Sequence, residues 1–363
     1  MSNSAKLDKG GQMEEALRAY FLDLGYFVVR GTKFRYQDFD VTDVDLWLYM
    51  RPSTMTRERI NVDIKNKRTP QAIERIFWTK GLQQVLGLDK CMVATTDTRP
   101  AVLEFGQSND VIVLDGSFLS RLYKYKSTGE RLSEEEFAAL IIDDNIGELK
   151  SEWRKKFEAS KSTLLSQLNY SGCNYWLGEA TDYINHVLIE YKRKEAACRL
   201  LYLSLSYFLV GLDYVFKDLI FFEADERAIS LRDGFRHGAI GKMGMDKIVS
   251  TSVSLIEQYT PRGRELSSIL RKNVSVAFDQ IQVEVLKEYY NRPEVTRNLF
   301  ANARKFEQLA YQRQFTTPNQ IETELQSIIG VTLDFSEIER KTFFDAFSNQ
   351  LSTVVEDKSK NDT

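Results

Sequence analysis

The 363-residue chain is poor in several residue types, and each shortage excludes a class of protein. With only 6 prolines and 43% apolar residues, most of its length cannot be disordered or of low complexity. The three cysteines (Cys91, Cys173 and Cys198) lie far apart and form no CxxC pair, which excludes a disulfide framework and a zinc module. Only two histidines are present, His186 and His237, so a polyhistidine metal site is excluded as well.

Neither sign of charge dominates the chain, which has 49 Lys+Arg against 52 Asp+Glu. This balance argues against a polycation that binds nucleic acid over its whole surface. Residues 1–11 are polar and lack the apolar stretch of a secretory signal. The most apolar window, Leu200–Phe222, is interrupted by Ser, Asp and Lys, whereas a bilayer span needs about 20 mostly apolar residues. We therefore expect a buried helix there, and a soluble cytoplasmic protein without a membrane partner.

The pattern of residues changes near residue 126. Residues 1–126 carry a net charge of +3 and alternate short strand-like runs with helical segments, which predicts an α/β domain with a sheet covered on both faces. The expected strands are Phe27–Arg30, Val44–Met50, Ile60–Ile64, Cys91–Thr95 and Val111–Leu114. The expected helices are Met13–Leu24, Ala72–Leu86, Ala101–Phe105 and Phe118–Tyr125.

The rest of the chain carries a net charge of −6 and has no strand-like runs beyond about Glu130. Its apolar residues recur three and four positions apart, which predicts an all-α domain over residues 127–355. The expected helices are Trp153–Leu168, Tyr183–Tyr191, Ala197–Phe222, Ile248–Tyr259, Leu266–Tyr290 and Ile321–Ile329. Residues 356–363 are charged and polar, and we expect them to form a frayed tail.

Two neighbouring expected strands carry the same alternation of apolar and polar residues. Because side chains alternate across a strand, the apolar residues point to the core and the polar ones share the other face. On that face the first strand presents Asp43 and Asp45, and the second presents Asp63 and Lys65. Carboxylates that are brought together repel each other, and a divalent cation relieves that repulsion.

The residue types on these strands suit a magnesium site. Mg²⁺ prefers oxygen ligands and keeps some of its waters, so two or three carboxylates suffice to hold it, and Mn²⁺ takes similar ligands. Such an ion polarises a phosphodiester and generates a hydroxide nucleophile, while a nearby lysine positions water or stabilises developing charge. The pattern therefore favours a metal-dependent nuclease.

At this point the sequence resembles a known family. Asp45 followed by Asp63-x-Lys65 resembles the motif of the PD-(D/E)xK nuclease superfamily. The opening residues Gly10-Gly11-Gln12-Met13-Glu14, with the helix end Leu24-Gly25-Tyr26, resemble the start of Mrr-type restriction enzymes and archaeal junction resolvases. Downstream, Val93-Ala94-Thr95-Thr96 and Ile112-Val113-Leu114-Asp115-Gly116 resemble the Mrr-type ending. The resemblance covers about residues 10–125, a third of the chain.

The resemblance implies a restriction-endonuclease-like fold with a central mixed sheet and a Mg²⁺-dependent DNA endonuclease. It implies that Glu14, Asp45 and Asp63 hold the metal and that Lys65 assists the attacking water. Glu14 suits the family spacing to Gly25 better than its neighbour, and it lies three residues from Leu17 on the inward stripe of the helix, whereas Glu15 is expected to face outward.

Several further residues have two interpretations. Asp43 either supports the metal site or is a solvated partner for a basic residue. Gln83 and Gln84 either support the site, as a glutamine does in related nucleases, or lie on an ordinary polar helix face. Basic residues near the acidic pair offer phosphate contacts to DNA, although residues 52–58 also suit a polar loop between strands. These basic residues are Arg57, Arg59, Lys65, Lys67 and Arg68.

The helical half contains a second candidate site, Arg232 and His237, five residues apart. The pattern resembles the signature of HEPN-type ribonucleases, which usually dimerise and cleave RNA without metal. That resemblance implies that His237 is the general acid or base and that Arg232 stabilises phosphate charge. The alternative is a histidine near a glycine-terminated helix end, where a cation is favourable.

We therefore expect a metal-dependent deoxyribonuclease joined to a helical domain. By analogy with prokaryotic defence and restriction systems, we expect this domain to sense a signal, mediate homo-oligomerisation or bind a partner protein. Two alternatives stay open. One is a HEPN-like ribonuclease in the helical half, and the other is a non-catalytic nucleic-acid-binding or assembly subunit.

Overall fold

The computed structural model describes residues 9–37, 39–67, 71–122, 129–141, 147–190 and 193–348. The chain forms two compact units. The first comprises Met1–Ser166 with Tyr311–Gln314, and the second comprises Gln167–Ala310 with Phe315–Thr363. The first unit thus extends past residue 126, where the sequence pattern changes. It includes residues 311–314, which return to it late in the chain and form a bridge between Arg131 and Gln312.

The first unit contains a five-stranded mixed sheet in the order β1-β2-β3-β4-β5. The first three strands are antiparallel, and β3, β4 and β5 are parallel. The strands are β1 (Phe27–Tyr36), β2 (Phe39–Met50), β3 (Glu58–Lys65), β4 (Lys90–Thr95) and β5 (Ile112–Leu114). The expected α/β domain with a mixed sheet is confirmed. The β1–β2 hairpin is longer than expected because its outer residues are exposed, so that ladder hydrogen bonds rather than burial define it.

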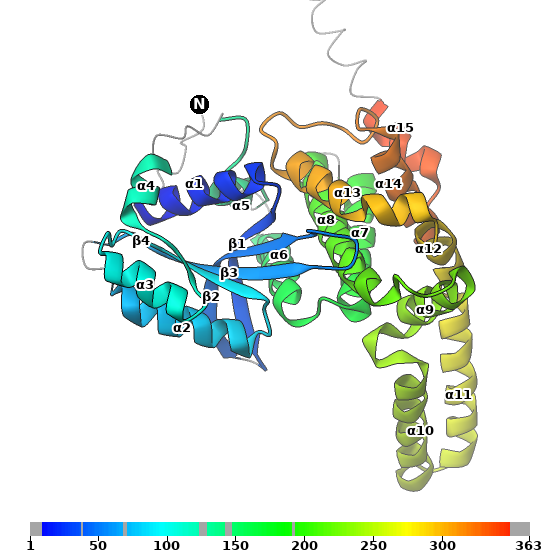
Figure 1. Ribbon diagram of the computed structural model, residues 1–363. Helices are drawn as coiled ribbons and strands as arrows, with labels where there is room; N and C mark the ends of the chain where they lie inside the picture. Colours follow the sequence, from blue (N-terminus) through cyan, green and yellow to red (C-terminus); the bar gives the residue numbers. More distant parts are fainter. Residues whose placement is uncertain are drawn as a thin grey trace, which may run out of the picture. The chain divides into compact units, whose positions relative to one another are not determined.

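Helices cover both faces of this sheet, as Figure 1 shows. Residues of α1 and α4 pack on one face against inward residues such as Leu46 and Val62. Residues of α2 and α3 pack on the other face against Cys91 and Val93. The helices of the unit are α1 (Lys9–Asp23), α2 (Ala72–Val85), α3 (Pro100–Ser108), α4 (Gly116–Leu122), α5 (Glu134–Ile141) and α6 (Gly147–Ser166).

The second unit is helical, as the sequence predicts. Its helices are α7 (Tyr170–Ile189), α8 (Lys194–Leu219), α9 (Ala224–His237), α10 (Gly241–Tyr259), α11 (Gly263–Gln280), α12 (Val283–Tyr290), α13 (Pro293–Tyr311), α14 (Thr323–Phe335) and α15 (Arg340–Ser348), with a short 3₁₀ turn η2 (Gly238–Ile240). The expected helix over residues 266–290 is two helices, because the backbone at Ile281 is extended. Helices α13 and α15 were not among the expected helices, and of α9 only the glycine-terminated end near His237 was considered; α9 buries only Leu231, Gly234 and Phe235.

Helix α8 forms the core of the second unit. By length and composition it is long and apolar enough to cross a membrane, but 89% of its most apolar window is buried inside the protein. Residues on every side of the helix are buried, including Tyr202, Tyr207 and Phe208. A helix that is apolar all round is either a core helix or a membrane span, and the protein itself covers this one.

Candidate active site

Asp45 and Asp63 lie side by side on neighbouring strands. Strand β2 pairs antiparallel with β3 so that Leu46 faces Val62, and one further step in this register brings the two aspartates opposite each other. The Asp45 carboxylate also accepts a hydrogen bond of 2.6 Å from the backbone amide of Ile64. Because Leu46 and Val62 point to the α1 face, alternation directs both aspartates to the face that α2 covers.

Arg75 of α2 contacts this pair directly. Its guanidinium binds both carboxylate oxygens of Asp63, with 2.7 Å between Nε and Oδ2. The Asp63 and Arg75 side chains are only 12% and 24% exposed. The sequence analysis missed Arg75. Its position in the sequence could have indicated its role. Arg75 lies on α2 next to the inward residues Ala72, Ile76 and Thr79, and a cation beside a buried stripe needs a carboxylate partner.

The electrostatic environment of Asp45 is unusual for a surface aspartate. Burial raises the pKa of Asp45 above its ordinary value, and the charge of Asp43 raises it further. The Ile64 amide, Lys65 and Arg75 act in the opposite direction without cancelling the effect. Lys65 therefore lies close enough to Asp45 to lower its pKa. Asp43 is exposed and lies opposite Lys33 of β1, which suits its interpretation as a solvated partner of a basic residue.

Glu14 lies on α1, which packs on the other face of the sheet, and an arginine holds it there. Burial raises the pKa of Glu14, and the negative charge of Asp45 contributes in the same direction. Arg30 of β1 lowers that pKa and donates to Glu14 over 2.7 Å. Arg30 lies within a buried strand, and a buried arginine requires such acidic partners.

The expectation that Glu15 faces outward is wrong. Its carboxylate accepts hydrogen bonds from Arg30 over 3.0 Å and from the backbone amide of Glu134 over 3.0 Å. Arg18 lies 3.4 Å from the same oxygen. The helical periodicity of α1 could not predict this, because the partners come from β1 and α5, which are distant in sequence.

The carboxylates suit a two-ligand magnesium site rather than a closed metal cage. Among the described residues, no group of three or more His, Cys, Asp and Glu side chains could hold a metal ion. Mg²⁺ is commonly held by one or two carboxylates together with waters and substrate phosphates. Asp45 and Asp63 provide two carboxylates, and Arg75 occupies the oxygens of Asp63 that such an ion would require. The donor set therefore fits Mg²⁺ or Mn²⁺ once Arg75 turns away from Asp63.

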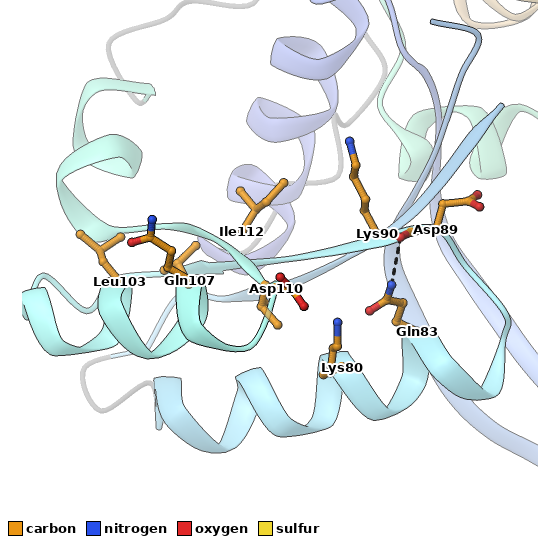
Figure 2. Close-up of a pocket in the computed structure, with 10 residues that line it drawn as sticks. Lys80, Gln83, Asp89, Lys90, Leu103, Gln107, Asp110 and Ile112 are labelled. Carbon is orange, nitrogen blue, oxygen red and sulfur yellow. Dashed lines mark hydrogen bonds between the residues drawn. The ribbon is translucent and has the colours of Figure 1, made fainter. Parts of the chain in front are cut away.

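The two glutamines of α2 lie away from these carboxylates. The Gln83 side chain donates to the backbone carbonyls of Leu88 and Asp89, at the end of α2 opposite Arg75. Gln84 is exposed. Gln83 lies at a hollow of about 670 Å³, which is lined by residues of α2, α3 and the edge of the sheet. Figure 2 draws the lining side chains, among them Lys80, Lys90 and Asp110. An ordinary polar helix face is thus the better interpretation of both glutamines.

The basic residues near the pair have different surroundings. Arg57 is buried and donates to the backbone carbonyls of Ser53, Thr54 and Thr56, so it organises its own loop. Arg59 forms an ion pair with Asp89. Lys67 is exposed, and Arg68 lies outside the described residues. Lys65 and Lys67 are therefore the residues of this set that suit phosphate contact.

Arg232 and His237 line a common hollow of about 590 Å³ between α9, α10 and α11. His237 is the last residue of α9, and Gly238, whose φ is 66°, caps the helix. The Nδ1 atom of His237 and the Nε atom of Arg236 are buried and have no hydrogen-bonding partner among the described residues. Arg232 and His237, the two residues of the ribonuclease hypothesis, thus line one hollow. His237 also lies at a glycine-capped helix end, as the alternative interpretation has it.

Comparisons with known proteins identified no relative of this chain. No protein-family model, no curated protein and no solved structure matches the chain.

Proposed function

We propose that the first unit is a Mg²⁺-dependent nuclease of the PD-(D/E)xK type that hydrolyses DNA phosphodiesters. The observation that supports it best is the pairing of Asp45 with Asp63 on adjacent strands, with Lys65 two residues further along the second strand. The raised pKa of Asp45 adds support, because a buried carboxylate that is incompletely neutralised favours a cation. The cytoplasmic location and the DNA partner are part of the same proposal.

Each residue has a defined task in this proposal. Asp45 and Asp63 would hold the ion, and Glu14 would act on the site only through its charge, from the α1 face of the sheet. Bound Mg²⁺ or Mn²⁺ would supply a polarised phosphate oxygen and a water of lowered pKa. Lys65 orients that water or stabilises negative charge that develops on the phosphate.

Arg75 has two consecutive tasks. Without metal, its guanidinium neutralises Asp63 and keeps the two carboxylates together. With that charge neutralised by a bound cation, the guanidinium would be available to a phosphate oxygen, a group that its planar fork binds well.

The second candidate is a ribonuclease site in the helical unit. The common hollow of Arg232 and His237 favours it, because the buried Nδ1 atom of His237 has no hydrogen-bonding partner among the described residues and could accept a hydrogen bond from a ligand. This site would need no metal. A non-catalytic nucleic-acid-binding or assembly subunit is the third reading of the chain.

Cleavage assays separate these proposals. The full chain is incubated with plasmid, linear and single-stranded DNA and with RNA, each with Mg²⁺ and with EDTA. We expect DNA cleavage that requires Mg²⁺ and disappears in Asp63→Ala and Lys65→Ala. The matched controls are Asp89→Ala, which removes the other ion-paired aspartate near β3, and Lys67→Ala. Metal-dependent cleavage that survives in both site variants removes the activity from this site.

The remaining outcomes are equally distinct. RNA cleavage that persists in EDTA and disappears in Arg232→Ala and in His237→Ala would make the helical unit the active one. Binding of DNA without cleavage in any arm would favour the non-catalytic subunit.

A further inference from the structure

Helix α2 carries a tryptophan that is open to solvent. The protein has four tryptophans, and three of them are fully buried: Trp47, Trp153 and Trp176. Trp78 of α2, by contrast, is 48% exposed. Apolar side chains that are exposed singly are common on protein surfaces, so the surroundings of Trp78 determine what it can do.

Trp78 lies beside the arginine of the candidate active site. The guanidinium carbon of Arg75 is 5.9 Å from the centre of a Trp78 ring, and the same guanidinium binds both carboxylate oxygens of Asp63. Residues three positions apart share one side of a helix, so both side chains project from the same side of α2. One guanidinium thus separates the indole from the Asp63 carboxylate.

Helix α2 runs antiparallel to β3 over this part of the sheet. Arg75 binds Asp63. One turn later along α2, the Thr79 carbonyl accepts a hydrogen bond of 3.2 Å from the side chain of Asn61, which lies two residues earlier on β3. The exposed fraction increases from the carboxylate outward, from 12% for Asp63 to 24% for Arg75 and 48% for Trp78. These three side chains therefore lead from a largely buried carboxylate to solvent, and the indole is the outermost of them.

We propose that Trp78 stacks on an unpaired base of the nucleic acid that this site binds, which makes single-stranded DNA the preferred substrate. This inference rests on the proposed nuclease function. A nucleotide joins a base to a phosphate, and the site offers a partner for each: the indole of Trp78 for the base, and the guanidinium of Arg75 for a phosphate oxygen. Bases of a duplex are stacked on their neighbours inside the helix, so only an unpaired base presents its face to a side chain.

The neighbouring aromatic residue of α2 has different surroundings. Phe77 is 63% exposed, but its ring meets the ring of Phe105 on α3 edge to face, with 5.4 Å between the ring centres. Phe77 thus turns toward α3, whereas Trp78 turns toward Arg75. Phe77→Leu is therefore the matched control for a substitution of Trp78, because it removes an exposed aromatic ring from the same helix without touching the guanidinium.

Tryptophan fluorescence tests the contact directly, because Trp78 is the tryptophan that a ligand can reach. The full chain is titrated with a short oligothymidylate and with the same strand annealed to oligoadenylate. Ca²⁺ replaces Mg²⁺, so that a cation with the same preference for oxygen ligands is present while binding is measured. We expect the single strand to quench the emission and to shield the indole from acrylamide, and the duplex to quench it far less.

Substitutions test how much the contact contributes. In fluorescence anisotropy with a labelled oligothymidylate, Trp78→Ala should raise the Kd roughly 5- to 150-fold, the range found when a stacking side chain is removed. Trp78→Phe retains a stacking ring and should recover part of the loss, and Phe77→Leu should bind as the wild type does. In cleavage assays with Mg²⁺, Trp78→Ala should raise KM and leave kcat within about twofold, because stacking binds the substrate and the transition state alike. Circular dichroism establishes that each variant is folded.

The outcomes separate this inference from the nuclease proposal. If folded Trp78→Ala binds single strands as tightly as the wild type, the inference is overturned, even where the chain cleaves DNA. Emission that responds to protein concentration and not to DNA would also overturn it, because Trp78 would then lie in a protein interface. Quenching by the single strand in a chain that cleaves no DNA would support the stacking contact and remove the nuclease.

Discussion

Removal of Arg75 should make the stability of the first unit depend on magnesium. In Arg75→Ala, Asp63 loses a guanidinium that binds both of its oxygens, and Asp45 loses a neighbouring positive charge. Hydrogen bonds to charged groups contribute about 1.5–3 kcal/mol, so the free energy of unfolding in EDTA should fall by about 2 kcal/mol at neutral pH. Two largely buried carboxylates then remain without their principal counter-charge.

Magnesium should reverse this loss. An ion that binds only the folded state at 100 times its Kd adds roughly 2.7 kcal/mol, which would restore Arg75→Ala to about the wild-type level. The wild-type chain should gain less, because Arg75 competes with the ion for Asp63.

Urea unfolding followed by circular dichroism, with Mg²⁺ and with EDTA, measures both effects. The matched control is Arg59→Ala, which also breaks a single arginine–aspartate pair, with Asp89. It should lose stability without regaining it in Mg²⁺. If Mg²⁺ stabilises Arg75→Ala no more than it stabilises Arg59→Ala or the wild type, the two aspartates do not form a cation site.

Four further predictions concern single side chains. Glu14→Gln should lower the rate of Mg²⁺-dependent cleavage, and Glu15→Gln should instead lower the melting temperature, because Glu15 holds Arg30 and the amide of residue 134. Burial raises the pKa of Asp45, so the stability that the protonated Asp45 contributes is present below pH 3.8 and is lost as the pH rises through the raised pKa. Asp45→Asn should therefore have a higher urea midpoint than the wild type at pH 7. Below pH 3.8 the variant should have no advantage. Burial alone would raise the pKa of Glu134, but Lys161 and Arg18 bring it to about 2, so its contribution is present above pH 4.5 and is lost as the pH falls toward 2. Glu134→Gln should accordingly cost up to about 3 kcal/mol at pH 7, with a difference from the wild type that shrinks in acid titrations. Finally, His237→Ala should leave gel-based DNA cleavage within about twofold of the wild type, since a metal-dependent site needs no histidine base; a complete loss in a folded variant would place the activity elsewhere.

The alternation of apolar and polar residues was sufficient to predict the part of the site that lies on adjacent strands. Side chains alternate between the two faces of a strand, so Leu46 of β2 and Val62 of β3 point inward. The same alternation places Asp45 and Asp63 together on the opposite face. The burial of α8 followed from its composition in the same way, because a helix with apolar residues on every side must be covered. Such patterns depend only on the geometry of one element, which the local sequence determines.

Tertiary structure alone decided what packs against those faces. Periodicity shows which side of its own helix a residue occupies, but not which element lies opposite that side. Arg75 therefore appeared as an ordinary helix residue until α2 packed beside Asp63. Glu15 seemed to point to solvent until β1 and α5 supplied Arg30 and the amide of Glu134. These partners lie 12 to 119 residues away in sequence, and because ion pairs of this kind leave no periodic trace, only the folded chain brings their charges together.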